Sequence, residues 1–94
     1  YLSSPMQAFL DEWCEVAADQ SVRRKDIQLA WRVWCEENGH VPGSIADFGR
    51  KLRAVLPKIV DEQRRVDGHR DRWYVGLTLN SDAYTRLNRR TIGV

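Results

Sequence analysis

Arginine is the residue type in this chain best suited to bind another molecule. Twelve of the fifteen cationic residues are Arg. Residues 48–94 contain eleven cations against five acidic residues, whereas residues 1–47 contain four against eight. A guanidinium group donates hydrogen bonds in a fork that fits phosphate oxygens and guanine edges. This uneven distribution of charge along the chain favours an anionic partner for the second half. A solvated basic face without function is the alternative.

The other residue types that do chemistry are few and scattered. His40 and His69 stand apart in expected loops, while Cys14 and Cys35 stand within apolar patterns. We therefore expect two reduced core thiols rather than zinc ligands or a disulfide. Ser44 has no neighbour that would act as its base. The sequence also has no Gly-rich phosphate loop, Cys-x-x-Cys pair or Gly-x-Ser-x-Gly turn. We expect no enzyme activity, cofactor or metal site.

The length of 94 residues fits a single domain with one core. Hydrophobic residues make up 43% and charged residues 30%, which is typical of a globular protein. No segment approaches the roughly 20 apolar residues that a membrane helix needs. The opening residues 1–5 have no signal-peptide pattern. They also lack an initiating Met, so we expect a fragment of a longer protein.

Two helices are expected first. Ser4 is a suitable N-cap for a helix that ends within residues 18–21, and Val22 adds one residue of strand. The second helix runs from about Lys25 to Asn38, with Gly39 as its stop. Their apolar residues recur at helical spacing and predict a shared core: Met6, Phe9, Leu10, Trp13, Val16 and Ala17, then Ile27, Ala30, Trp31, Trp34 and Cys35.

A third helix, from about Ile45 to Leu56, follows a tight turn and begins after Ser44. Arg50 points almost opposite its apolar stripe, and Gly49 is expected to allow close approach of a neighbouring helix. A short helix with an apolar back and a basic front is typical of a DNA recognition helix. The expected core residues are Ile45, Phe48, Leu52, Val55 and Leu56.

After Pro57 the pattern changes from helix to strand. Ile59 to Val66 predicts one strand and residues 72–79 the next, joined by the hairpin turn Asp67-Gly68. The second strand is expected to place Trp73, Val75, Leu77 and Leu79 on one face. Beyond Leu79 the sequence fits either a short helix with Tyr84 and Leu87 or a loose basic arm. The predicted fold is α+β: a winged helix-turn-helix, with three helices followed by a two-stranded β-hairpin wing.

Three segments also resemble one particular family. Residues 34–39, 48–52 and 72–77 are similar to the C-terminal winged-helix domain of D5-like superfamily 3 primase-helicases, which occur in phages, plasmids and poxviruses. The opening residues 5–12 resemble the first helix of those domains. The resemblance implies a winged-helix domain over residues 1–79, with residues 80–94 as a basic tail or short helix.

The resemblance implies an accessory DNA-binding role. The domain would position the ATPase and primase domains of its own chain on duplex or forked DNA, in the cytoplasm of a bacterial or archaeal cell, within a phage or other mobile element. No membrane or small-molecule partner is expected. A protein-docking module that uses the acidic first half is the alternative. A dimeric transcription regulator is less expected, because no long terminal helix is seen.

The expected DNA contacts come from the third helix and the hairpin. The helix corresponds to the recognition helix of that family and the hairpin to its wing. The helix and the residues beside it contribute Ser44, Asp47, Arg50, Lys51, Arg53, Ala54 and Lys58, and the wing contributes Arg64, Arg65, His69, Arg70 and Arg72.

Overall fold

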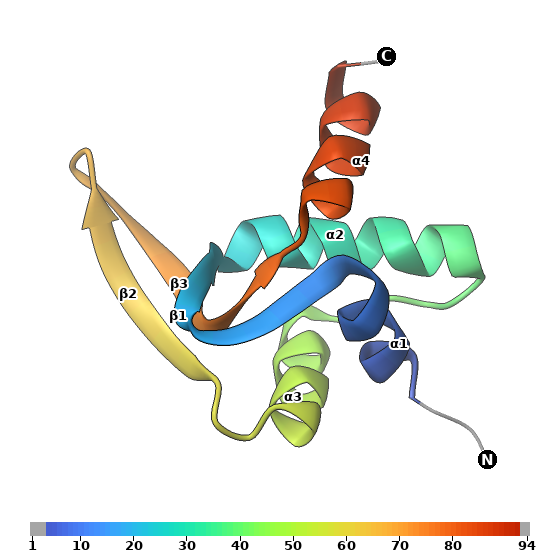
Figure 1. Cartoon of the computed structure of the whole chain (residues 1–94), viewed down its shortest axis with the longest axis horizontal. Helices are drawn as coiled ribbons and strands as arrows, with labels where there is room; N and C mark the ends of the chain where they lie inside the picture. The colour runs from blue at the N-terminus through green and yellow to red at the C-terminus, as the bar shows by residue number, and fades with distance from the viewer. Residues whose placement is uncertain (1–3, 93–94) are drawn as a thin grey trace.

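The fold packs helices against a three-stranded antiparallel sheet (Figure 1). The computed structural model describes residues 4–92, so residues 1–3 and 93–94 of the expected domain and tail lie outside it. The elements in chain order are α1 (Pro5–Trp13), β1 (Cys14–Arg23), α2 (Arg24–Asn38), α3 (Ile45–Val55), β2 (Val60–Val66), β3 (His69–Leu79) and α4 (Ser81–Ile92). The predicted α+β winged helix is confirmed, with β2 and β3 forming the wing.

Local sequence signals set the helix ends. The Ser4 hydroxyl accepts a hydrogen bond from the Gln7 backbone N–H, at 3.2 Å. Ser44 does the same for Asp47 at the start of α3, at 3.1 Å. Gly39 ends α2 with a φ of 73°, a left-handed conformation that favours glycine. The predicted starts and the predicted stop of α2 are therefore confirmed.

The first helix is shorter than predicted. It ends at Trp13, and the following ten residues form β1, which pairs with β3 from Cys14↔Leu79 to Arg23↔Trp73. Val16 is 60% exposed rather than part of a helical core stripe, and Ala17 is also in the strand. The expectation for both residues was wrong, because the hydrogen-bond ladder with a strand some sixty residues later outweighs the local helical spacing.

An irregularity between β1 and β3 changes which residues face the core. Val16 pairs with Leu77 and Ser21 with Val75, so residues 17–20 of β1 lie opposite Gly76 alone. Gly76 has a φ of 115°, which L side chains rarely adopt. The alternation of β3 slips by one residue here. Tyr74 is therefore buried together with Leu77 and Leu79, and the prediction that Trp73 and Val75 share their face was wrong.

Aromatic rings fill the centre of the core. Phe9 contacts both Trp31 and Trp34, with ring centroids 5.4 and 6.1 Å apart. Phe48 links Trp31 to Tyr74 of the sheet, at 6.0 and 6.2 Å. The predicted packing between the helices is confirmed. Ile45 is the exception: it is 65% exposed, because it lies in the first turn of α3, before the helix reaches the core.

The two thiols are buried and free, as predicted. Burial raises the pKa of Cys14 to about 12. It also raises the pKa of Cys35, against a smaller opposing effect of the Lys51 charge. Both thiols are therefore neutral near pH 7.

The last helix packs against the body of the domain. Ala83 and Leu87 are buried in the common core, and the Arg86 guanidinium lies 5.6 Å from the centroid of the Trp13 ring. Among residues 4–92, no helix has the length and apolar character needed to cross a membrane.

Candidate nucleic-acid interface

One carboxylate gathers three arginines at the base of the wing. The Oδ2 atom of Asp61 lies 3.4 Å from Arg72 Nη1, 3.6 Å from Arg53 Nη2 and 3.9 Å from Arg24 Nη1. The three cations come from β3, the last turn of α3 and the first turn of α2. We call Asp61, Arg24, Arg53 and Arg72 the Asp61 cluster. It carries two net positive charges where the helices meet the wing.

Strand alternation explains the position of this cluster. Asp61 pairs with Tyr74, and Gln63 pairs with Arg72. Paired residues share a face of the sheet, so Asp61 and Arg72 lie on the face of Tyr74, which points into the core. Arg53 lies on the flank of α3 that faces the sheet, since it follows Gly49 by four residues and a Cβ added at Gly49 would meet the Tyr74 hydroxyl at 3.6 Å.

The carboxylate is enclosed, whereas its partners are open to solvent. The Asp61 side chain is 17% exposed, but those of Arg53 and Arg72 are 59% and 52% exposed. A guanidinium has five N–H donors, so an ion pair to Asp61 leaves donors free for an anionic ligand. The Tyr74 hydroxyl is affected as well: burial and then the Asp61 charge raise its pKa, against the three guanidinium charges.

The same face carries further cations toward the tip of the wing. Arg65 and Arg70 are direct cross-strand partners, and both are exposed. Like charges opposite each other destabilise a strand pair. The arrangement is therefore unfavourable for folding and suits a surface that meets an anion.

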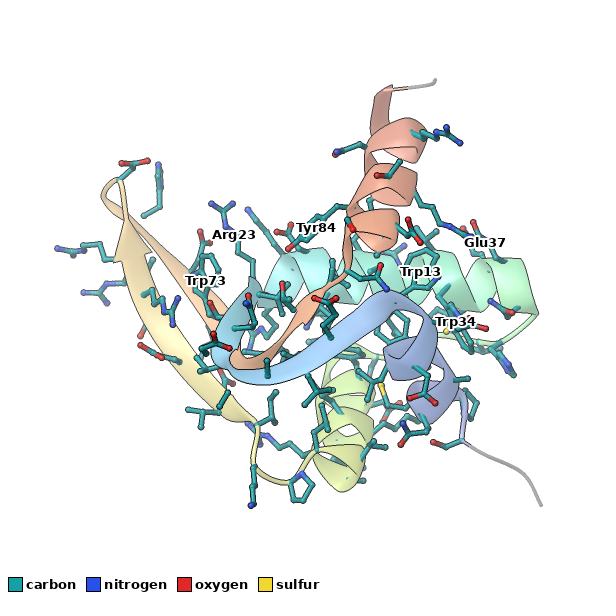
Figure 2. All side chains as sticks on the ribbon, viewed as in Figure 1. Trp13, Arg23, Trp34, Glu37, Trp73 and Tyr84 are labelled. Carbon is teal, nitrogen blue, oxygen red and sulfur yellow. The ribbon has the colours of Figure 1, made fainter. Side chains whose placement is uncertain are left out.

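Arg64 lies on the opposite face of the wing, with His69. Its guanidinium is 5.1 Å from the centroid of the Trp73 ring and donates to the Ser21 hydroxyl at 3.1 Å. Arg23 lies over the same ring, at 5.7 Å (Figure 2). The predicted wing residues thus divide between two faces: Arg65, Arg70 and Arg72 on one, Arg64 and His69 on the other.

The predicted contacts on α3 point in several directions. Arg50 projects away from the core and pairs with Asp47, which occupies the first turn. Lys51 and Ala54 lie beside Ser4 and Met6 of the N-terminal segment, on the flank away from Gly49. Ser44 caps the helix. Only Arg53 of these residues joins the Asp61 cluster.

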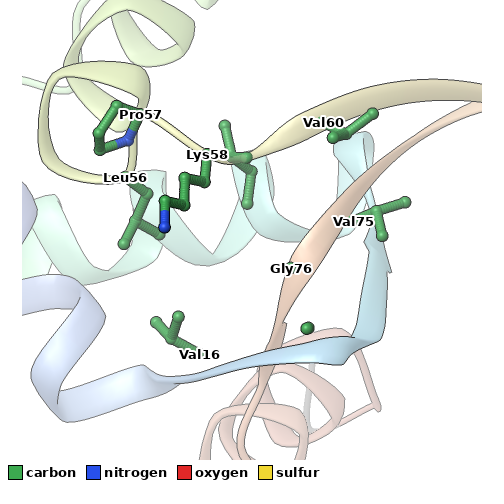
Figure 3. A pocket seen from close by; sticks show the side chains of 9 residues that line it. Val16, Leu56, Pro57, Lys58, Val60, Val75 and Gly76 are labelled. Carbon is green, nitrogen blue, oxygen red and sulfur yellow. The ribbon is translucent and has the colours of Figure 1, made fainter.

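Lys58 lies beside an apolar groove instead. The groove has a volume of about 550 Å³ and runs between the α3–β2 connection and the irregular part of β1 (Figure 3). Val16, Leu56, Val60 and Val75 form much of its wall. Lys58 contributes the cationic side chain to this lining, and it does not belong to the Asp61 cluster.

The family of RFX DNA-binding domains matches residues 4–81, from the cap of α1 to the first residue of α4. The chain belongs to this family. No curated protein matches it. The RFX domain is a DNA-binding module with a winged-helix fold, so the predicted fold and the general prediction of DNA binding are both supported. The primase-helicase family suggested by the resemblance is not supported.

Core packing explains why the resemblance led to a different family. Several of the apolar residues that carry it are buried in this RFX domain, among them Trp34, Phe48, Leu52, Tyr74 and Leu77. A winged helix needs such residues at these positions whatever larger protein it belongs to. Similarity at these positions therefore indicates the fold and does not separate one winged-helix family from another.

Sequence reasoning missed Arg24 and Asp61. Arg24 belongs to the acidic half of the chain, and Asp61 has the wrong charge for a residue sought as a DNA contact. The signal for Asp61 was available, however. The turn at Asp67-Gly68 fixes Val66 opposite His69, which places Asp61 opposite Tyr74 on the face of Arg72. The position of Arg24 depends on tertiary packing.

Two acidic residues of the first half of the chain, the part expected to serve protein docking, have partners within the domain. The Glu12 carboxylate accepts a 2.6 Å hydrogen bond from Trp34 Nε1. Glu37 pairs with Arg86 of α4 at 3.5 Å. These two side chains connect α1, α2 and α4, so structural contacts account for their presence.

Proposed function

We propose that this RFX domain binds duplex DNA through α3 and the wing, as the DNA-binding part of a transcription regulator. The observation that carries the proposal is the Asp61 cluster, which joins the exposed guanidiniums of Arg53 and Arg72 into one basic surface. Membership of the RFX DNA-binding family supports the same function.

Two kinds of contact are assigned to this surface. Arg65, Arg70 and Arg72 of the wing bind phosphates, and such contacts supply most of the affinity and make it depend on salt. Arg50 and Arg53 of α3 contact base edges, where a bidentate Arg–guanine pair discriminates by roughly 1–3 kcal/mol. Arg50 is 77% exposed, so its pairing with Asp47 is weak enough to exchange for a base.

The role in a primase-helicase rests on the sequence resemblance alone, whose residues define the fold. Binding to ATPase and primase domains of the same chain rests on it too. We therefore favour the regulator, a function that needs only the DNA-binding surface described above.

A titration of three labelled DNA forms tests the proposal. The domain is added to a duplex, a fork and a single strand of matched sequence, with unlabelled random DNA as competitor. We expect the duplex to bind at least 10-fold more tightly than the single strand, and the fork to bind no better than the duplex. Preference for the fork would favour a replication role, and no binding to any form at low salt would contradict DNA binding.

A further inference from the structure

We propose that Asp61 is a positioning residue for sequence discrimination, because it holds Arg53 of α3 and Arg72 of the wing in a fixed relation to each other. The inference rests on the proposed function, since it concerns how the same surface distinguishes one duplex from another. Asp61 itself is not proposed to contact DNA.

The first support is the geometry of the carboxylate. A single oxygen, Oδ2, serves guanidiniums from three separate elements, within 3.9 Å of each. The ion pair with Arg53 connects the α3 side of the surface to the wing, and the pair with Arg72 crosses between the two strands of the wing. Helix α3 and the wing are thus linked through one side chain.

The other carboxylate oxygen of Asp61, Oδ1, also bears on the role of this residue. Asp61 Oδ1 is buried and has no hydrogen-bond partner in residues 4–92. A buried acceptor without a partner costs free energy. All the contacts of this carboxylate with the three guanidiniums are therefore made through Oδ2.

The flexibility of an arginine side chain affects its two kinds of DNA contact differently. A guanidinium on an unrestrained side chain still finds a phosphate, because phosphates line both strands at every sequence. Bidentate contact with one guanine requires that the guanidinium group has a particular position and that its plane has a particular orientation. A side chain already held in place loses less conformational entropy on making that contact. Asp61 therefore favours the sequence-dependent contacts more than the sequence-independent ones.

The position of the Asp61 carboxylate favours sequence-dependent contacts, but its negative charge weakens binding to every duplex. A carboxylate at a DNA-binding surface repels phosphate, so its neutralisation strengthens binding to any duplex. Asp61→Asn is therefore expected to raise affinity for a scrambled duplex while lowering the preference for the favoured one. A variant that merely unfolds would lose affinity for both, so the two measurements separate positioning from folding.

The experiment uses duplexes selected by the wild-type domain from a random pool, and a scrambled duplex of the same composition. Asp61→Asn is compared with Glu62→Gln, which removes the same charge from the adjacent residue. Glu62 lies on the other face of the wing and pairs with Arg64 at 3.5 Å. NMR signals of the arginine Nε–H groups, recorded without DNA, report whether Arg53 and Arg72 are held.

The inference predicts that Asp61→Asn lowers the ratio of selected to scrambled affinity about 10-fold, whereas Glu62→Gln leaves that ratio within about 2-fold of wild type. The dispersed Nε–H signals of Arg53 and Arg72 are expected to collapse in Asp61→Asn only. An unchanged ratio in Asp61→Asn, or an equal fall in both variants, would overturn the inference while DNA binding stood. Failure of the wild-type domain to select any duplex would overturn the proposed function and this inference with it.

Discussion

The indole nitrogen of Trp34 donates a hydrogen bond to the Glu12 carboxylate at 2.6 Å and so joins α2 to α1. Trp34 is buried, and its ring also packs on Phe9 and stacks on His40. A buried donor that loses its acceptor costs about 1–3 kcal/mol. This pair is therefore one of the contacts that hold α1 and α2 together.

We expect Glu12→Ala to lower the free energy of unfolding by about 1–3 kcal/mol, because the Trp34 N–H loses its acceptor. Chemical denaturation followed by tryptophan fluorescence measures the change. Glu15→Ala serves as the control, since Glu15 is an exposed acidic residue of β1; its effect is expected to stay within about 0.5 kcal/mol. Equal effects of the two variants would show that the hydrogen bond contributes nothing specific.

Two glycines are predicted to respond in opposite directions to the same substitution. Gly76→Ala forces a side chain into a φ of 115° and brings its Cβ to 3.4 Å from Ile59 Cδ1. The expected loss of stability is about 1–3 kcal/mol. Gly49 lies within α3, where an added Cβ meets the Tyr74 hydroxyl at an ordinary 3.6 Å. Gly49→Ala is therefore expected to stabilise the domain by about 0.5–1 kcal/mol.

Thermal unfolding of both variants checks this pair. A rise in melting temperature for Gly76→Ala would mean that the irregular pairing of β1 and β3 does not require glycine. A fall in melting temperature for Gly49→Ala would indicate that a neighbouring element packs closely at Gly49, as expected from the sequence.

Alkaline pH is predicted to destabilise the domain through Cys14. Burial raises the pKa of this thiol from 9.0 to about 12. The unfolded thiol therefore loses its proton first, so the contribution of Cys14 to stability is complete below pH 9 and is lost as the pH rises to about 12. At 1.36 kcal/mol for each pKa unit, the loss reaches roughly 4 kcal/mol.

Other groups titrate in the same range, so the test compares wild type with Cys14→Ala. The free energy of unfolding of wild type should fall more steeply between pH 9 and pH 11 than that of the variant. Parallel curves for the two proteins would contradict the assignment. Reaction of the folded wild type with a thiol reagent at pH 8 should be slow at both cysteines, which are buried.

The parts of the fold that depend on neighbouring residues were predictable from the sequence. Ser4, Gly39 and Ser44 act at helix ends through hydrogen bonds or a backbone conformation within a few residues. The turn at Asp67-Gly68 joins the wing strands in the same local way. These signals do not depend on the rest of the chain.

The parts that depend on distant segments were not predictable. β1 is a strand because β3 offers it a partner, and the slip at Gly76 follows from how those strands meet. For the candidate site, charge and a helix-wing pattern indicated cations in the second half of the chain, and their contact with DNA stays a prediction. The Asp61 cluster was missed, since Arg24, Arg53 and Asp61 come together only when α2 and α3 pack beside the wing.

The salt dependence of duplex binding tests the central claim most directly. Wild type is compared with Arg53→Ala/Arg72→Ala and with Arg32→Ala/Arg89→Ala, which removes two exposed cations from α2 and α4. Fluorescence anisotropy with a labelled duplex gives the affinity at each salt concentration. The log of the wild-type affinity should fall linearly with log salt. Since Arg72 is assigned to a phosphate and Arg53 to a base edge, the first variant should bind more weakly, with a slope smaller by about 1, and the second should match wild type. Equal weakening of both variants, or a wild-type affinity that does not change with salt concentration, would contradict DNA binding at the Asp61 cluster.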